Sequence, residues 1–361
     1  PMIRRRDDEI ACQLRQAGLT VKTFKASLLA EPEEIENKSG LPFKVFTPFW
    51  KHCLKKINAS TPLPAPQKVE TPKVSLRTTE LSELNLEPEQ DWGHSMNEVW
   101  TPGELGAASA LELFINESFN DYAKIRNFPN TKGTSRLSPH LRFGEISPRQ
   151  IKHSLEQSGH AHWKESHYLS EIGWREFGYH LLYHFPHTVR EPLRPQFNRF
   201  PWKEDSPQLR SWQKGQTGYP LVDAGMRELW ATGWMHNRVR MVVASFLVKH
   251  LLIHWRHGAD WFWDTLVDAD LASNTQGWQW TAGSGADAAP YFRIFNPTTQ
   301  AIKFDPEGNY IRKWVPELRH MSAPDIFEPS RVDRGQNYPN PIVNHSDARD
   351  RALKAYEKTK A

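Results

Sequence analysis

The stretch Asp268-Ala-Asp-Leu-Ala-Ser-Asn-Thr-Gln-Gly-Trp-Gln-Trp280 is the part around which the chain is organised. It holds two carboxylates (Asp268 and Asp270), the Asn274 carboxamide and two indoles (Trp278 and Trp280). Buried carboxylates must be paired, hydrogen-bonded or protonated, so we expect an arginine or a ligand rich in N–H groups beside them. Indoles offer faces on which a flat molecule can stack. The stretch therefore predicts a site for a flat heteroaromatic ligand.

The residues around this stretch follow a helical period. From Thr101 onward apolar side chains recur about every 3.6 residues, whereas alternating strand patterns are scarce. Proline and an acid in the first turn indicate a helix start at Thr101-Pro-Gly-Glu104, and Ser147-Pro-Arg-Gln150 repeats the proline signal. The pattern predicts helices over 107–126, 151–157, 223–254 and 255–267. Residues 101–361 are therefore expected to form one mainly α-helical domain.

The chain before this domain divides into two parts. Residues 1–57 predict a helix over Asp7–Ala17, a strand-like run over Thr20–Phe24 and a helix near Phe46–Ile57. So short a segment is marginal as an independent domain, so we interpret it as the tail of a larger one. Residues 58–100 are expected to be a linker, because residues 60–76 hold four prolines that block helices and central strands.

Composition excludes several classes of protein. Cys12 and Cys53 are too few for a disulfide scaffold, a four-cysteine zinc site or an iron–sulfur cluster, and they suit a reducing, intracellular compartment. No apolar run is long enough to span a membrane, and the first residues do not resemble a signal peptide. The net charge of +4 and pI of about 8.9 are compatible with a polyanionic partner. A start at Pro1, with no initiator methionine before it, suggests a fragment.

A hydroxyl-rich loop precedes one of the predicted helices. Gly133-Thr-Ser-Arg-Leu-Ser-Pro139 offers three hydroxyls, one guanidinium and a flexible backbone. Such groups beside a helix N-terminus can bind phosphate. The alternative is an ordinary helix cap.

Two predicted helices carry polar groups on one face. Glu171 lies three residues before Trp174 and four before Arg175, so the three share a face; the alternative is a surface ion pair beside a core tryptophan. On the predicted helix over 223–254, Asn237, Arg240 and Met241 lie at positions i, i+3 and i+4, so they form a stripe along one face.

Arg240 has a predicted partner, because an inward arginine and the inward carboxylate of Asp268 are each costly unless paired. His236 is interpreted as a structural hydrogen-bonding residue, since no second ligand stands at metal spacing, and no metal site is expected.

Basic and aromatic residues alternate over 190–214. The cations are Arg190, Arg194, Arg199, Lys203, Arg210 and Lys214, and the rings are Phe197, Phe200, Trp202 and Trp212. This mixture suits a surface that follows a nucleic-acid backbone. A solvated loop with aromatic anchors is the alternative.

Taken in order, these motifs resemble the photolyase/cryptochrome family, and specifically its class I cyclobutane pyrimidine dimer (CPD) photolyases. The resemblance covers nearly the whole chain, from Arg5 to Glu317. It rests on Thr134-Ser-Arg-Leu-Ser-Pro139, Trp174-Arg-Glu-Phe177, Gly233-Trp-Met-His-Asn-Arg-Val-Arg-Met241, Asp268-Ala-Asp-Leu-Ala-Ser-Asn274, Gly277-Trp-Gln-Trp280 and Arg293-Ile-Phe-Asn-Pro297. It implies an all-helical FAD-binding domain (101–361) preceded by the linker (58–100) and by the C-terminal remnant (1–57) of an α/β Rossmann-like antenna domain.

The resemblance also implies roles for individual residues. The FAD-binding set is Tyr122, Thr134, Ser135, Arg136, Leu137, Ser138, Arg240, Asp268, Ala269, Asp270 and Asn274. The DNA- and dimer-binding set is Arg126, Glu171, Trp174, Arg175, Gly178, Asn237, Arg238, Met241, Trp280, Arg293 and Gln300. The residues implied in catalysis are Asn274 facing flavin N5, Glu171 in the dimer pocket, and the electron-carrying tryptophans Trp202, Trp255 and Trp278.

The implied activity is light-dependent repair of CPDs by electron transfer from excited reduced FAD to a flipped-out dimer. Asn274 favours this over plant-type cryptochromes, which carry Asp there, and the stripe of Asn237 and Met241 favours it over (6-4) photolyases, which carry a His pair. Whether a folate or deazaflavin antenna binds is left open, because most of the antenna domain is missing. We expect a monomer that acts on dimer-containing DNA in the cytoplasm of a bacterial-type cell, without a membrane or protein partner. The alternatives are a cryptochrome-like blue-light photoreceptor and a helical DNA-binding domain without cofactor.

Overall fold

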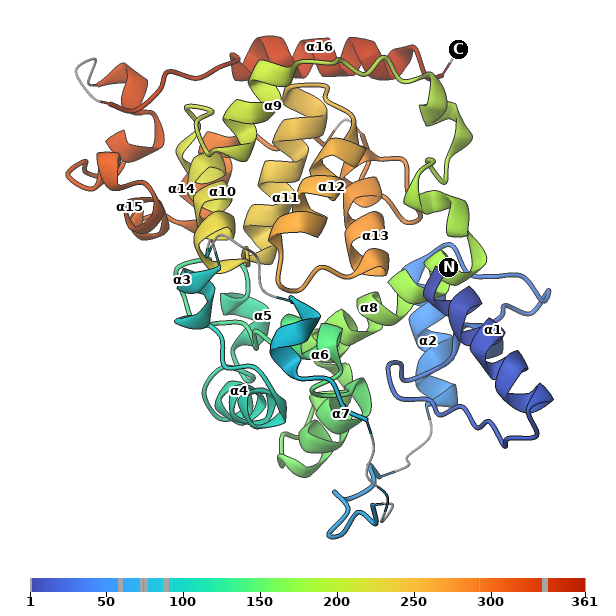
Figure 1. The fold of residues 1–361 in the computed structure, drawn as a ribbon. Helices are drawn as coiled ribbons and strands as arrows, with labels where there is room; N and C mark the ends of the chain where they lie inside the picture. Colours follow the sequence, from blue (N-terminus) through green and yellow to red (C-terminus); the bar gives the residue numbers. More distant parts are fainter. Residues whose placement is uncertain are drawn as a thin grey trace.

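The protein is helical throughout the part that the structure describes, and its only β pairing there is a single parallel bridge between Lys203 and Ile253 (Figure 1). The structure, a computed structural model, describes residues 2–57, 61–71, 74, 77–86, 91, 93–291, 293–332 and 337–360. Its α-helices are α1 (Met2–Gln16), α2 (Phe46–Lys56), α3 (His94–Asn97), α4 (Glu104–Glu117), α5 (Tyr122–Ile125), α6 (Ser138–Phe143), α7 (Pro148–Gln157), α8 (His167–His184), α9 (Ser206–Gln213), α10 (Pro220–Thr232), α11 (Asn237–Ser245), α12 (Trp255–Thr265), α13 (Leu271–Ala282), α14 (Pro297–Phe304), α15 (Asn309–Trp314) and α16 (His345–Glu357). The predicted fold class is confirmed.

Short 3₁₀-helices and one π-helix connect these elements. The 3₁₀-helices are η1 (Pro32–Glu34), η2 (Leu81–Leu84), η3 (Trp163–Glu165), η4 (Pro186–Val189), η5 (Pro195–Arg199), η7 (Pro316–Leu318), η8 (Asp325–Phe327) and η9 (Pro329–Arg331). The π-helix, η6 (Phe246–His250), continues α11 directly.

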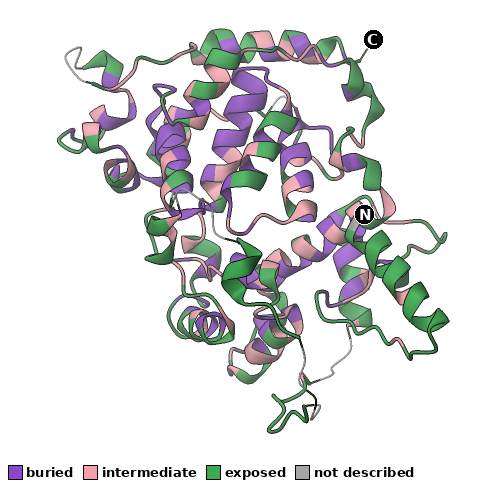
Figure 2. Ribbon diagram, in the orientation of Figure 1, coloured by how far each residue is buried: buried purple, intermediate pink, exposed green. Residues whose placement is uncertain are grey.

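The larger hydrophobic core lies among α9 to α15, in the region coloured mostly as buried in Figure 2. The prediction of one continuous helix over 223–254 is wrong. Gly233 ends α10 in the left-handed conformation (φ 64°), which a glycine adopts without strain. A side chain there would also lie 2.5 Å from Val267. His236 then caps α11 by accepting a hydrogen bond from the Arg238 N–H.

The second core joins the N-terminal segment to the helical domain. Phe49 and Trp50 of α2 are buried in the same cluster as Ile172 and Phe177 of α8. Gly173 makes this contact feasible, because a Cβ there would lie 2.6 Å from the Trp50 ring. The predicted helix near 46–57 is confirmed as α2, whereas the strand-like run over Thr20–Phe24 is irregular. Residues 28–57 therefore share a core with α8.

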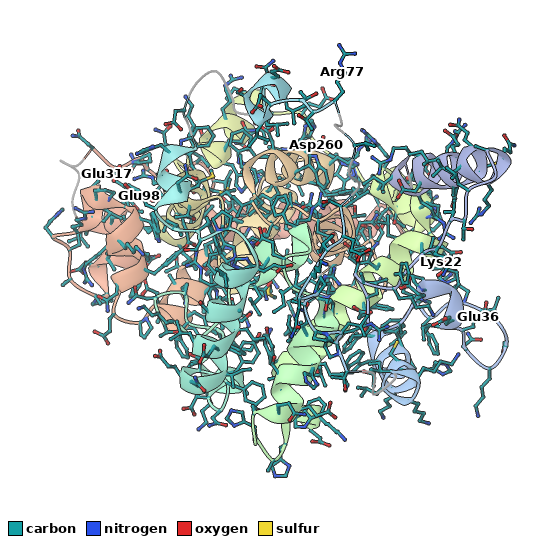
Figure 3. The ribbon with its side chains drawn as sticks, turned by 60° about the horizontal axis from the view of Figure 1, so that its bottom comes forward. Lys22, Glu36, Arg77, Glu98, Asp260 and Glu317 are labelled. Atoms are coloured by element: carbon teal, nitrogen blue, oxygen red, sulfur yellow. The ribbon has the colours of Figure 1, made fainter. Side chains whose placement is uncertain are left out.

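The end of the linker is docked onto α10. The Ser95 hydroxyl donates to the Ala231 carbonyl at 2.7 Å, and the Trp100 indole N–H donates to the Thr232 carbonyl at 2.8 Å. Earlier described residues of the linker extend away from the helices (Figure 1), and Arg77 projects outward in Figure 3. The predicted helix over 107–126 is two helices, α4 and α5, because the chain turns between Glu117 and Tyr122. The domain boundaries at 57/58 and 100/101 remain predictions.

Small residues set the helix crossings that build the site. A Cβ on Gly258 of α12 would lie 2.0 Å from the Trp278 ring of α13, so only glycine permits this approach. A Cβ on Gly178 of α8 would lie 3.7 Å from the backbone of Ala272 on α13, so these two helices also pack closely. Polar caps fix the helix starts, since Asp270 accepts from the Ser273 N–H and His254 accepts from the Arg256 N–H. Helix α13 therefore packs against α8 and α12, and it also contacts α11.

Candidate functional site

The predicted partnership of Arg240 with Asp268 is confirmed. The two side chains form an ion pair of 2.8 Å, and the Asp268 side chain is only 3% exposed. Arg240 also donates to the Met235 carbonyl, so its guanidinium is held at two points. The other carboxylate oxygen, Asp268 Oδ1, is buried and has no hydrogen-bond partner among the described residues. A buried acceptor without a partner is costly, so this atom fits an N–H donor from a bound ligand.

Asp270 and Asn274 are oriented by neighbouring helices. Asp270 caps α13 through one oxygen and accepts from the Tyr179 hydroxyl of α8 through the other. The Asn274 amide donates to the Ala259 carbonyl of α12 at 2.8 Å, which leaves its Oδ1 as the atom that can meet a ligand. Arg142 of α6 donates to the Ala269 carbonyl. Sequence reasoning missed Tyr179 and Arg142, because neither lies at a helical spacing from the residues that they contact.

In the loop Thr134–Ser138, two aromatic rings hold the side chain of Arg136, whose role in FAD binding stays a prediction. The Arg136 guanidinium lies between two indoles, 4.5 Å from the Trp100 ring and 4.4 Å from the Trp234 ring, and burial lowers its pKa. Its backbone has φ 53°, a left-handed conformation that is uncommon for a residue with a side chain. These two contacts fix the Arg136 side chain and thereby stabilise the loop. The groups left to meet a phosphate are the backbone N–H groups and the hydroxyls of Thr134, Ser135 and Ser138.

The Glu171 carboxylate of α8 is held by an arginine from another segment. The Arg126 guanidinium pairs with Glu171 at 2.6 Å and lies 5.1 Å from the ring of buried Tyr122. The alternative of a Glu171–Arg175 surface pair is wrong, because Arg175 instead donates to the Ser27 carbonyl and approaches Glu176. Glu171 keeps one third of its side chain exposed, so a second oxygen can accept hydrogen bonds from a substrate.

Trp174 follows Glu171 by one helical turn. One face of its ring is stacked on Phe46 of α2, with ring centroids 3.8 Å apart and an interplanar angle of 9°. The residue remains 37% exposed. The contact with α2 fixes the orientation of the indole, which suits a platform for a flat substrate.

The other residues of the predicted DNA- and dimer-binding set lie on α8, α11, α13, α14 and the loop before α14. On α11, Asn237 is exposed, Met241 is half-buried, and Arg238 donates to the Asn127 side chain at 2.6 Å while lying 4.4 Å from the Phe304 ring. Arg293 is exposed, Gln300 and Trp280 are half-buried, and Gly178 lies inside the α8–α13 contact. The Arg238–Asn127 bond brings α11 beside the segment that carries Arg126.

Of the three predicted electron-carrying tryptophans, one is half-buried and two are buried. Trp202 is half-buried, and its ring centroid lies 4.9 Å from that of His254, which lies 5.5 Å from Trp255. Trp255 and Trp278 are each 2% exposed and belong to the same hydrophobic cluster. The imidazole of His254 between two indoles was not anticipated from the sequence.

The geometry of these groups defines a class of protein. The helices hold a buried, partly unsatisfied carboxylate–arginine pair and a hydroxyl loop suited to phosphate. On α8 they also hold a partly exposed carboxylate and an oriented indole. Together they suit a dinucleotide cofactor with a heteroaromatic ring beside a site for a second aromatic substrate. Among the described residues, no group of His, Cys, Asp and Glu could hold a metal ion, and no helix could span a membrane.

The chain belongs to the photolyase/cryptochrome family. Residues 168–358 match the family described as FAD binding domain of DNA photolyase, and residues 1–67 match the family described as DNA photolyase. The deoxyribodipyrimidine photo-lyase of Agrobacterium fabrum is 47% identical over 98% of this chain and 77% of its own length. The subdivision of the chain at residues 57 and 100 is not decided by these matches.

Two solved structures have the same fold. A bacterial class III photolyase from Agrobacterium tumefaciens is 46% identical with a TM-score of 0.94, over 99% of this chain and 77% of its own. A Synechocystis cryptochrome is 32% identical with a TM-score of 0.85, over 97% of this chain and 76% of its own. The predicted family is confirmed, whereas the predicted subclass, class I, stays a prediction beside a class III relative of such high similarity.

The residues present fit the FAD that this family binds. An isoalloxazine ring carries N–H donors and carbonyl acceptors, which complement Asp268 Oδ1, the Arg240 guanidinium and Asn274 Oδ1. The diphosphate is complemented by the hydroxyls and N–H groups of residues 134–138. The unpartnered Oδ1 of Asp268 is the observation of this structure that such a ring accounts for.

Proposed function

We propose that this protein binds DNA that contains a cyclobutane pyrimidine dimer and repairs the dimer in a reaction driven by light. The observation that carries the proposal is the Glu171 carboxylate, which Arg126 holds in place at 2.6 Å beside the indole of Trp174. A flipped-out thymine pair presents N–H donors and flat faces, and an acceptor beside a stacking surface complements both. FAD, when bound in its reduced form and excited by light, would supply the one-electron reductant that this ring cleavage requires.

The protein's own residues position and shield this chemistry. Arg126 donates a hydrogen bond to one oxygen of Glu171, which leaves the second oxygen able to accept hydrogen bonds from a substrate. The Asn274 amide is fixed by the Ala259 carbonyl, so its Oδ1 would be free to accept a hydrogen bond from a flavin N–H. Asp268 and Arg240 would hold the polar groups of the ring through opposite charges. Each group is oriented before the substrate arrives, which lowers the cost of reorganisation.

The remaining assignments support binding to DNA. Arg238 and exposed Arg293 would neutralise phosphates, while Asn237, Met241 and Trp280 would line the pocket together with Trp174. Trp202, Trp255 and Trp278 would deliver electrons that keep the flavin reduced. Because ionic contacts dominate such binding, affinity for DNA should fall as salt rises.

The test compares dimer loss with flavin content. Photoreduced protein is mixed with an oligonucleotide that carries one thymine dimer, and intact dimer is quantified after blue light. Glu171→Gln should lose at least tenfold in repair rate and bind dimer DNA more weakly, while the flavin content stays that of the parent. Glu165→Gln, at an exposed position in η3, is the matched control and should match the parent. Unchanged dimer content with the parent protein refutes the proposal.

A cryptochrome-like photoreceptor is the second candidate, favoured by the Synechocystis cryptochrome of TM-score 0.85. Such a protein photoreduces its flavin but repairs nothing. Its affinity would be equal for dimer-containing and undamaged DNA, which a competition experiment measures.

We further propose that the protein acts as a monomer on chromosomal DNA in the cytoplasm, without a protein partner. A dimer lesion occupies one site on one strand, and both ion pairs that we assign to the flavin and the dimer form within one chain. Light scattering after gel filtration, with and without dimer DNA, tests the monomer. A stable dimer of chains on one lesion would contradict it.

A further inference from the structure

A cavity outside the proposed flavin and dimer pockets lies against Trp202. It has a volume of about 280 Å³ and is lined by Arg190, Trp202, Lys203, Glu204, His254, Arg256, His257 and Asp260. Ligand pockets in proteins hold about 300–1,000 Å³, so this cavity suits a small molecule. Asp260, labelled in Figure 3, is exposed on α12 at the edge of the cavity.

The cavity contacts Trp202, the half-buried member of the three tryptophans. The Trp202 ring lies between Phe200, at a centroid distance of 4.3 Å, and His254, at 4.9 Å. Its backbone neighbour Lys203 is tied to the segment before α12, because the Lys203 N–H donates to the Leu252 carbonyl at 2.8 Å. A molecule in the cavity therefore contacts an indole of fixed position, and Trp255 lies directly behind His254.

The lining favours an anion. Arg190, Lys203 and Arg256 come from three segments, and no carboxylate of the described residues lies within 4.0 Å of their side-chain nitrogens. Arg256 also lies in the first turn of α12, whose backbone N–H groups point towards its N-terminal end. Glu204 and Asp260 offset only two of the three positive charges.

His254 adds a hydrogen-bond donor. Its Nδ1 accepts from the Arg256 N–H at 3.1 Å, so the proton of the neutral ring is on Nε2. Burial lowers the pKa of His254 to about 4, and the nearby Arg256 and His257 add to this effect, so the ring is neutral at pH 7.

We propose that this cavity binds a small anionic one-electron reductant of the enediolate class, such as ascorbate, and that the bound anion restores Trp202 after oxidation. One electron passes from the enediolate monoanion to the Trp202 radical cation, which still carries its indole N–H proton, and the donor releases its remaining hydroxyl proton to water and becomes a radical anion. Trp202 returns to its closed-shell state. This inference rests on the proposed function, because Trp202 is oxidised only when it has passed an electron inward.

Ascorbate binding to the flavin-free protein in the dark is the first test, by calorimetry. The parent should give a saturable heat with one site per chain. Arg256→Gln and Lys203→Gln should each weaken binding about fivefold, the upper range for a partly exposed charge pair. Arg349→Gln, an exposed arginine on α16, is the matched control and should bind like the parent. Absence of saturable binding by the parent overturns the proposal.

Flash photolysis of the flavin-loaded protein is the second test, with the tryptophan radical absorbance as readout. In the parent, the rate of radical decay should reach a plateau as ascorbate is added, with half-saturation at the dissociation constant found by calorimetry. Arg256→Gln should raise that half-saturating concentration about fivefold. Neutral hydroquinone should give a linear dependence in every variant. A linear dependence on ascorbate in the parent overturns the proposal. If no radical forms at all, the electron-carrying role of the tryptophans fails, and the calorimetric result alone decides whether the cavity is an anion site.

Discussion

Removal of the negative charge at Asp268 is the sharpest test of the cofactor site. In Asp268→Asn the side-chain shape is kept, but Arg240 loses the carboxylate that it contacts at 2.8 Å. Breaking a buried ion pair by removing one partner costs about 3–5 kcal/mol. The Asp268 side chain is 3% exposed and that of Arg240 is 25% exposed, and Arg240 keeps its bond to Met235, so we expect the lower value of about 3 kcal/mol.

This loss converts into a measurable change in melting temperature. Unfolding entropy scales at about 2.1 cal/mol/K per residue, so a chain of 361 residues loses roughly 1.3 °C per kcal/mol. Asp268→Asn should therefore lower the Tm of the flavin-free protein by about 4 °C. Asp350→Asn, which breaks an exposed pair with Arg349 on α16, is the matched control and should change stability by less than about 0.5 kcal/mol.

A double substitution separates stability from cofactor binding. Arg240→Met combined with Asp268→Asn leaves no unpaired charge, so most of the lost stability should return. Flavin binding, measured by the visible absorbance that stays with the purified protein, should remain at least tenfold weaker than in the parent. A double variant that retains parental flavin affinity refutes the assignment of this pair to the cofactor. A single variant with an unchanged Tm contradicts the stability cost assigned to breaking the ion pair.

Three further predictions follow from close contacts and buried charges. Gly258→Ala should lower the free energy of unfolding by about 1–3 kcal/mol in urea titrations, because its Cβ would meet the Trp278 ring at 2.0 Å; an unchanged midpoint contradicts that contact. Arg136→Ala should weaken FAD binding while Arg136→Lys retains part of it, since a lysine can still lie between the Trp100 and Trp234 rings; equal affinity of both variants and the parent excludes the stabilising role. Burial, with a smaller effect from Arg293, lowers the pKa of Lys249 from 10.5 to about 7, so the unfolded chain binds more protons between these values and stability should rise with pH across that window. Lys249→Met should remove this rise from urea titrations at pH 7 and pH 9, and identical slopes for variant and parent contradict it.

The sequence by itself determined the helical class and the local elements. Helices over 46–57, 151–157 and 255–267 were predicted from periodicity and caps, and the structure confirms them as α2, α7 and α12. These signals are local, because the caps and the apolar stripe of a helix lie within a few turns of one chain. The Arg240–Asp268 pair was also predictable, since two inward charges with no nearer partner must meet.

Tertiary structure alone decided which distant residues meet. Glu171 pairs with Arg126 across 45 positions, in preference to Arg175 one turn away on its own helix. The Arg136 guanidinium contacts the rings of Trp100 and Trp234, which come from segments distant from its own loop. Periodicity cannot predict such contacts, because they depend on how helices from separate segments cross. Their crossings depend in turn on packing at sites such as Gly173 and Gly258, where a single methyl group would not fit.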